Sequence, residues 1–180
     1  GEPQEEHGGL SDYGHRVVEE MNRCHMLIDV SHASEKTVMD VLAHSRLPIA
    51  ATHTCCRSLC NHPRNFSDDV LLAIAHAGGV VQCTMYGGFC ALDHPEDYGI
   101  PQDQNPSILT FMVHLRHLIR LCGIDHVGIG SDFDGDGGVP GLDDVASMLK
   151  ITQMLLAEGF SDDDICRLWG DNFRRVLHAV

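Results

Sequence analysis

Three polar residues able to do chemistry, His32, His53 and Asp132, each follow a short apolar stretch of the sequence. His53 comes 21 residues after His32, about the length of one strand–helix unit. In parallel α/β folds the carboxyl ends of the strands meet at one edge, where ligands and catalytic groups lie. We therefore expect the two imidazoles to face one crevice, since neutral imidazole nitrogens are good zinc ligands. Asp132 could then be a further ligand, or a base for the proton of a water that the metal activates.

Arg64 is a fourth candidate, placed on the loop after the second predicted strand, on the same side as His53. Its planar guanidinium could hold a substrate carboxylate through two hydrogen bonds. Taken singly, each of these residues has a plainer explanation, because a lone histidine is usually a hydrogen-bonded core or turn residue and a lone arginine is usually solvated. Three polar residues at three strand ends favour a metal or catalytic site over that explanation.

The sequence alternates regularly between apolar stretches typical of strands and amphipathic stretches typical of helices, and these elements would position the candidate residues. We predict strands at residues 26–30, 48–52, 79–85 and 126–130. We predict helices at residues 11–24, 34–45, 67–78 and 105–123, and over most of the remaining chain apart from breaks near Gly159 and Gly170. Ser34 and the pair Asn105-Pro106 have the chemistry of helix starts.

Such alternation predicts an α/β fold built from parallel βαβ units. Four strands make half of an eight-stranded (β/α)8 TIM barrel, which typically takes about 250 residues. The periodicity alone leaves two possibilities open, an open four-stranded sheet or one half of such a barrel. We expect residues 1–180 to form a single domain, because 180 residues with 43% hydrophobic content can build one sizeable core.

The net charge limits the kinds of molecule that the protein could bind, and the cysteines indicate the cellular compartment in which it would fold. A net charge of −14 argues against a nucleic-acid partner, because phosphate binding requires a basic surface. We expect no signal peptide, and we expect no membrane helix because no apolar run approaches the roughly 20 residues that one needs. Eight cysteines are present, but Cys55 and Cys56 are adjacent, and Cys24, Cys83 and Cys122 lie in apolar stretches. We expect buried free thiols in a reducing compartment, hence a cytoplasmic location.

Two other motifs have competing metal interpretations. The carboxylates of residues 132–137, with Asp143, have the spacing of an EF-hand calcium loop, but they follow a predicted strand instead of a helix, and Pro140 interrupts the loop. The second motif, Cys55-Cys56 with Cys60 and His62, lacks the C-x-x-C pairing of a zinc knuckle. We therefore expect neither calcium binding at the first nor metal binding at the second.

Several segments together resemble the renal or membrane dipeptidase family, zinc peptidases with a (β/α)8 barrel of the amidohydrolase kind. The similarity covers nearly the whole chain, and its motifs occur in the family's order. The matching segments are residues 9–23, Met26-Leu27-Ile28-Asp29-Val30-Ser31-His32, His53, Asn61-His62-Pro63-Arg64-Asn65, residues 128–135, residues 141–145 and residues 170–176.

The resemblance implies a role for each candidate residue. His32 and His53 are similar to two ligands of one Zn²⁺ in a binuclear pair. Arg64 is similar to the group that binds the terminal carboxylate of a dipeptide substrate. Asp132 is similar to the acid after the eighth strand, which contacts the substrate amine and takes part in proton transfer. The chain would then supply strands five to eight of the barrel.

The sequence also departs from the family pattern. The family's His-x-Asp metal motif and its bridging Glu are absent from the 180 residues, and we expect them upstream of Gly1. The binuclear site would then be incomplete, and the isolated chain inactive. Thr52-His53-Thr54-Cys55 replaces a more usual serine-rich stretch, which predicts altered surroundings for His53. Two alternatives remain open, hydrolysis of another small amide or lactone on the same scaffold, and a non-catalytic fragment or paralogue. A homo-oligomer is also left open.

Overall fold

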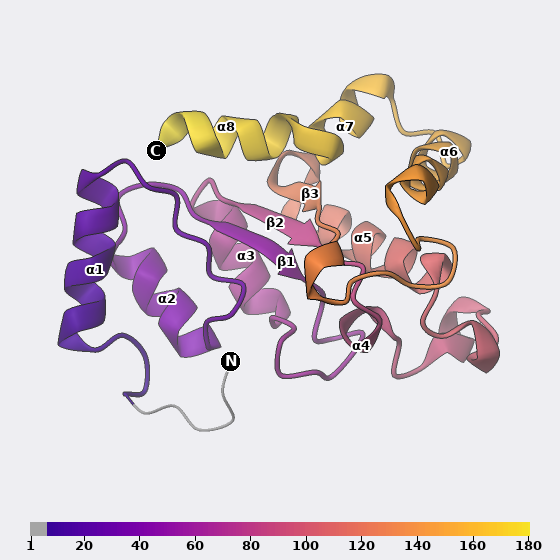
Figure 1. Cartoon of the computed structure of the whole chain (residues 1–180), viewed down its shortest axis with the longest axis horizontal. Helices are drawn as coiled ribbons and strands as arrows, with labels where there is room; N and C mark the ends of the chain where they lie inside the picture. Colours follow the sequence, from indigo (N-terminus) through magenta and orange to yellow (C-terminus); the bar gives the residue numbers. More distant parts are fainter. Residues whose placement is uncertain (1–6) are drawn as a thin grey trace.

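The computed structural model describes residues 7–180, in which three short parallel strands alternate with helices (Figure 1). The strands lie in the order β1-β2-β3, with Ala50 opposite Val80 and Val81 opposite Val127. Their bounds are β1 Ala50–Thr54, β2 Val80–Cys83 and β3 Val127–Ile129. The helices are α1 Asp12–Arg23, α2 Glu35–His44, α3 Asp68–His76, α4 Gly87–Cys90, α5 Ile108–Cys122, α6 Leu149–Ala157, α7 Asp162–Cys166 and α8 Asn172–Ala179. A single π-helical turn, Arg167–Asp171, joins the last two.

The helices begin where short polar side chains can satisfy free N–H groups. The hydroxyl of Ser11 accepts from the Gly14 N–H at the start of α1, and Ser34 accepts from Thr37 at the start of α2. The predictions for these two helices are therefore confirmed to within a residue at each end.

The start of α5 was predicted wrongly. The helix begins at Ile108, capped by Ser107, whose side chain and backbone exchange hydrogen bonds with the first turn. Asn105 does not cap the helix, because its side-chain amide bonds both the N–H and the carbonyl of Leu92 at 2.8 Å. The amide therefore holds the preceding loop.

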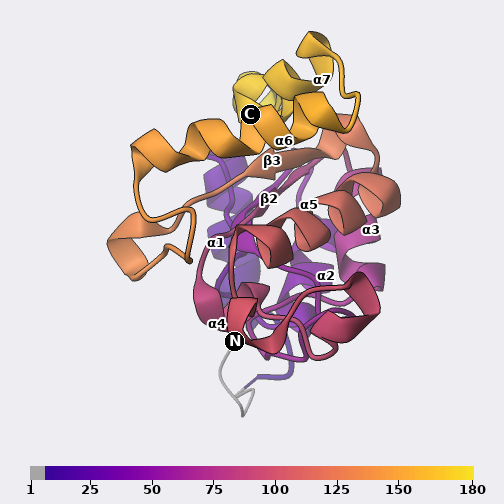
Figure 2. The ribbon, with the colours of Figure 1, turned by 90° about the vertical axis from the view of Figure 1, so that its right-hand side faces the viewer.

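One face of the sheet carries the main hydrophobic core. Ala51, Val81 and Val127 point into a cluster with Leu71 of α3 and Leu115 of α5, all fully buried. Two views at right angles show α3 and α5 together on this side of the sheet (Figures 1 and 2). The opposite face is apolar only where the strands begin: Ala50 and Val80 pack against Val176 of α8. Further along, Thr52 and Gln82 stay half-exposed.

The prediction of four strands is wrong for residues 26–30. This segment pairs with β1 only at Asp29 opposite Ala50, through hydrogen bonds from the Ala50 N–H to Ile28 and from the Val30 N–H to Ala50, both 2.9 Å. The next rung of a parallel ladder is missing, because the Thr52 N–H donates to the side chain of Asp29 instead. A side chain thus takes over where the backbone pairing ends.

The cysteines are all free, as expected, but they are not all buried. Cys24 and Cys166 are exposed, while the other six lie in the core. The expectation for Cys24 is therefore wrong, because it lies at the solvent-facing end of α1, where it caps the helix. Within residues 7–180, no helix combines the length and the apolar character required to cross a bilayer.

Candidate functional site

The carboxyl end of β1 is irregular, and this irregularity positions His53. The pairing of β1 with β2 shifts register between Ala51 and Thr54, so His53 lies in a bulge that breaks the strand's alternation. The bulge is approached closely by the end of β3. A Cβ atom on Gly130 would lie 2.3 Å from the carbonyl oxygen of Thr52, so only glycine allows this approach. The ends of β1 and β3 therefore come together despite the strand between them.

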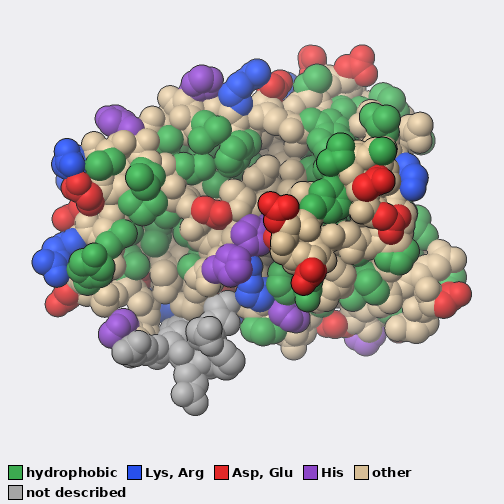
Figure 3. Space-filling model, in the orientation of Figure 1, with side chains coloured by type: hydrophobic (Ala, Val, Ile, Leu, Met, Phe, Trp, Pro, Cys, Tyr) green, Lys and Arg blue, Asp and Glu red, His purple; other side chains and the backbone are tan. Residues whose placement is uncertain are grey.

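The structure brings His32 and His53 into contact. Their Nε2 atoms lie 2.8 Å apart, and the ring centroids are 4.9 Å apart with an interplanar angle of 61°. Histidine side chains also gather in the middle of the face shown in Figure 3, beside acidic and basic groups. Burial, assisted by the positive charge of Arg64, lowers the pKa of His32, which favours a neutral imidazole with a lone pair to offer.

Asp29 and the two hydroxyl residues beside it hold the two histidines. Asp29 Oδ1 accepts from the N–H and the hydroxyl of Ser31, at 3.1 and 2.7 Å, and from the N–H of Thr52 at 3.1 Å. Asp29 Oδ2 accepts from the Thr52 hydroxyl. Ser31 Oγ in turn accepts from the His53 N–H at 3.0 Å, and Thr52 Oγ1 lies 2.9 Å from His53 Nδ1. Burial acts to raise the pKa of Asp29, but the hydrogen bonds from Thr52 and Ser31 together outweigh it, so the pKa is lowered.

Arg64 also lies beside His32. Its guanidinium donates to the carbonyl of Ser31, the residue before His32, and its carbon Cζ lies 5.3 Å from the centre of the Phe89 ring. Burial lowers the pKa of Arg64, while the charges of Asp132 and Asp29 act to raise it. Within residues 7–180 the Ser31 carbonyl is the one hydrogen-bond acceptor of this side chain, so further N–H donors are available to an anion.

Asp132 follows β3 in a left-handed backbone conformation, with φ of 58° and ψ of 29°. Its carbonyl accepts from the N–H groups of Gly135 and Gly137, at 2.9 and 2.7 Å, which folds the following loop back over it. Its negative charge acts on both His32 and Arg64, against the larger effect of burial on their pKa values. The four residues predicted from sequence therefore lie in one neighbourhood.

The paired imidazoles fit part of a zinc site. Both face each other through Nε2, and two histidine nitrogens at about 2.05 Å from a tetrahedral Zn²⁺ would be about 3.3 Å apart, so a small opening of the pair would admit the ion. In the part of the chain that the structure describes, no group of three His, Cys, Asp or Glu side chains is placed to hold a metal. These residues therefore supply two ligands and not a complete set.

Asp29 and Ser31 were not predicted to act at the site, whereas the stretch that contains Thr52 was predicted to alter the surroundings of His53. The available signal was local: an aspartate two residues before a serine commonly accepts that residue's N–H in a turn. No local sequence pattern could predict the contact of Phe89 with Arg64, because Phe89 lies on a helix 25 residues further along the chain.

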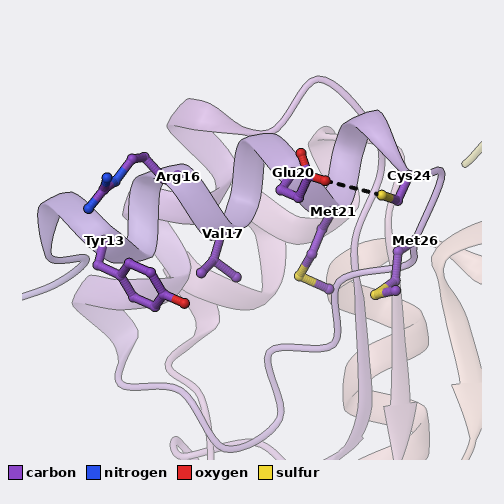
Figure 4. A pocket seen from close by; sticks show the side chains of 7 residues that line it. All are labelled: Tyr13, Arg16, Val17, Glu20, Met21, Cys24 and Met26. Atoms are coloured by element: carbon purple, nitrogen blue, oxygen red, sulfur yellow. Dashed lines mark hydrogen bonds between the residues drawn. The ribbon is translucent and has the colours of Figure 1, made fainter.

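An apolar hollow of about 380 Å³ lies elsewhere, on the outer side of α1 (Figure 4). None of the four predicted site residues lines it. It is lined by Tyr13, Arg16, Val17, Glu20, Met21, Cys24 and Met26. Its side chains are mostly apolar and include no histidine, so it lacks the imidazole pair found at the strand ends.

Comparisons with known proteins point to one family. The model of the membrane dipeptidases, peptidase family M19, matches residues 1–180. The chain is 39% identical over 175 residues to the dipeptidase verJ of Clonostachys rogersoniana, covering 97% of this chain but 42% of that protein. The chain therefore spans less than half the length of this curated relative.

Solved structures agree in fold. The probable dipeptidase PvdM of Pseudomonas aeruginosa superposes with a TM-score of 0.85 at 29% identity, over 96% of this chain and 55% of that one. A metallopeptidase of Rhodobacter sphaeroides, solved with a phosphinate mimic of the dipeptide L-Ala-D-Ala, superposes with a TM-score of 0.82 at 31% identity, over 95% and 47%. The α/β arrangement of these residues is thus that of known dipeptidase structures.

Proposed function

Because the chain belongs to the membrane dipeptidase family, peptidase family M19, we propose that it supplies the C-terminal half of a (β/α)8 barrel in a zinc-dependent dipeptidase. The observation that carries this proposal is the contact of His32 and His53 through Nε2, beside Arg64 and Asp132, at the carboxyl ends of the strands. The solved relative bound to a dipeptide mimic supports the substrate class.

Each residue has a role in this proposal. His32 and His53 would hold one Zn²⁺, which when bound polarises a carbonyl and makes water acidic enough to react at neutral pH. Arg64, stacked on Phe89 and anchored to Ser31, binds the terminal carboxylate of the dipeptide. Asp132 contacts the substrate amine and passes a proton to the leaving amine. Its negative charge acts on both His32 and Arg64, so its carboxylate lies near enough to these two residues for that role.

The role of Arg64 can be tested by matched substrates in a longer form of the protein that includes the upstream family segment. Arg64→Ala should raise KM for a dipeptide with a free carboxylate and change little for the same dipeptide amidated at its C-terminus. Arg46→Ala, on the exposed turn after α2, is the control and should leave both substrates unaffected. Equal losses on the two substrates in Arg64→Ala would remove the carboxylate-binding role.

The role of Asp132 predicts a different result. Asp132→Asn should keep the zinc content, because Asp132 is proposed as a proton carrier and substrate contact instead of a ligand. The substitution should lower mainly kcat, by about 100-fold or more, which is the usual contribution of general acid–base catalysis. Zinc measured by elemental analysis, together with steady-state kinetics, checks both points, and loss of zinc in Asp132→Asn would contradict the assignment.

A non-catalytic role for the 180 residues alone is favoured by one observation, the lack of a third metal-ligating side chain beside the two histidines within residues 7–180. The isolated chain should accordingly bind zinc weakly and show no meaningful dipeptide turnover. Robust turnover by this chain alone at zinc saturation would refute the proposal that it holds only part of the site.

A further inference from the structure

The carboxylate of Asp29 is the most heavily hydrogen-bonded group around the two histidines. Three donors converge on Oδ1, namely the Ser31 N–H, the Ser31 hydroxyl and the Thr52 N–H, and the Thr52 hydroxyl donates to Oδ2. A carboxylate has lone pairs for all four and no proton to give. The direction of every one of these bonds is therefore fixed toward Asp29.

This direction decides where the proton of His53 lies. The Thr52 hydroxyl has a single proton, and that proton points at Asp29 Oδ2. The same oxygen lies 2.9 Å from His53 Nδ1, so in this bond the hydroxyl can only accept. His53 Nδ1 must then carry a hydrogen, and in the neutral ring Nε2 is left with a bare lone pair. That lone pair faces His32 Nε2 at 2.8 Å.

We infer that Asp29 is a positioning residue, which acts through Thr52 to fix the His53 imidazole as the Nδ1–H tautomer and so to present Nε2 as an electron-pair donor. The use of this lone pair for zinc rests on the proposed function, whereas the tautomer does not. Metal-ligating histidines commonly donate their second N–H to such a partner, and the partner raises the basicity of the ligand. Here the partner is a hydroxyl and the carboxylate stands behind it.

Replacing one carboxylate oxygen of Asp29 by an NH₂ group should reverse the direction of the hydrogen bonds that run from Asp29 through Thr52 to His53. In Asp29→Asn the amide oxygen must take the Oδ1 position, because three donors converge there, which puts the NH₂ group beside Thr52 Oγ1. The amide then donates to Thr52, the hydroxyl turns to donate to His53 Nδ1, and the ring proton moves to Nε2. The nitrogen that faces His32 would carry a hydrogen and no longer have a free lone pair.

The first experiment reads the tautomer directly. Long-range ¹H–¹⁵N spectra of the metal-free 180-residue chain, at about pH 8 to keep imidazoles neutral, separate protonated from bare ring nitrogens. A His53→Gln sample assigns the signals. Wild type and Thr52→Ser should show His53 as Nδ1–H, and Asp29→Asn as Nε2–H. Asp132→Asn removes an equal charge near His32 but leaves the hydrogen bonds of Asp29 and Thr52 in place, so it should leave the His53 tautomer unchanged.

Thr52→Val keeps the inference testable if Asp29→Asn fails to fold. It removes the hydroxyl, so the fixed preference for Nδ1–H should be lost and the two tautomers should mix. His53 as Nε2–H in the wild type, or as pure Nδ1–H in Asp29→Asn or Thr52→Val, would overturn the inference.

The second experiment is a zinc titration of the same variants, without any substrate. Asp29→Asn and Thr52→Val should bind Zn²⁺ about 10- to 100-fold more weakly than wild type, and Thr52→Ser should restore the affinity. A switched tautomer with unchanged zinc affinity would overturn the link to the metal. If the tautomer and the affinity behave as expected but a longer form hydrolyses no dipeptide, the proposed function fails and this inference stands.

Discussion

His114 lies fully buried in α5 and joins two loops through its ring. Nδ1 accepts from the Cys56 N–H at 3.2 Å, on the loop that leads from β1 to Arg64, and Nε2 donates to the Ala91 carbonyl at 3.4 Å. Burial lowers the pKa of His114 from 6.5 to about 4, so the folded protein keeps the ring neutral. Protonation would put an unpaired charge into the core.

The consequence is a loss of stability in mild acid. As pH falls below 6.5 the unfolded chain takes up a proton at His114 while the folded chain does not, so the free energy of unfolding decreases until pH about 4. A difference of about 2.5 pKa units corresponds to at most about 3.4 kcal/mol, of which about 2 kcal/mol is lost between about pH 7 and about pH 5.

Replacing His114 by glutamine should remove this pH dependence. Urea unfolding at about pH 7 and about pH 5 should show that the variant loses about 2 kcal/mol less than wild type over this interval. Its stability at about pH 7 should itself be lower by about 1–3 kcal/mol, because the amide cannot satisfy both Cys56 and Ala91. His178→Gln, on the exposed end of α8, should keep the wild-type dependence. An equally large pH dependence in His114→Gln would refute the reasoning.

Two further outcomes follow from the packing of the fold. Gly130→Ala should destabilise the protein by about 1–3 kcal/mol in thermal unfolding, because its Cβ would lie 2.3 Å from the Thr52 carbonyl oxygen. Gly170→Ala should be nearly neutral, because its Cβ would meet no atom within 4 Å beyond its own stretch of helix. Thiol labelling of the native chain should modify Cys24 and Cys166 quickly and the six buried cysteines only after unfolding, and rapid reaction of more than two thiols would contradict the described core.

The sequence was sufficient to predict that His32 and His53 lie together, because their placement follows from parallel topology. A histidine directly after each of two neighbouring apolar segments must come to the same end of the sheet, whatever the details of pairing. His32 and His53 lie in contact for this reason. The starts of helices could likewise be predicted where one serine caps the first turn, as at Ser11 and Ser34.

Some side chains form hydrogen bonds in place of those that the local sequence pattern predicts, and these exchanges could not be predicted in the same way. Residues 26–30 have the apolar pattern of a strand, but the carboxylate of Asp29 takes the Thr52 N–H that would extend the pairing. Asn105 has the chemistry of a cap, but it bonds to Leu92, 13 residues earlier in the chain. In both cases the competing partner is distant in sequence, so no local pattern reports it.

The hydrogen bonds from β1 to Asp29 and Ser31 also bear on the free edge of the sheet. β1 is an outer strand of the sheet, and such a strand normally leaves a row of free N–H groups that can recruit another extended segment. Here the Thr52 N–H is taken by Asp29 and the His53 N–H by Ser31. The two short side chains thus occupy two N–H donors that another extended segment would otherwise use, at the same residues that hold the imidazole pair.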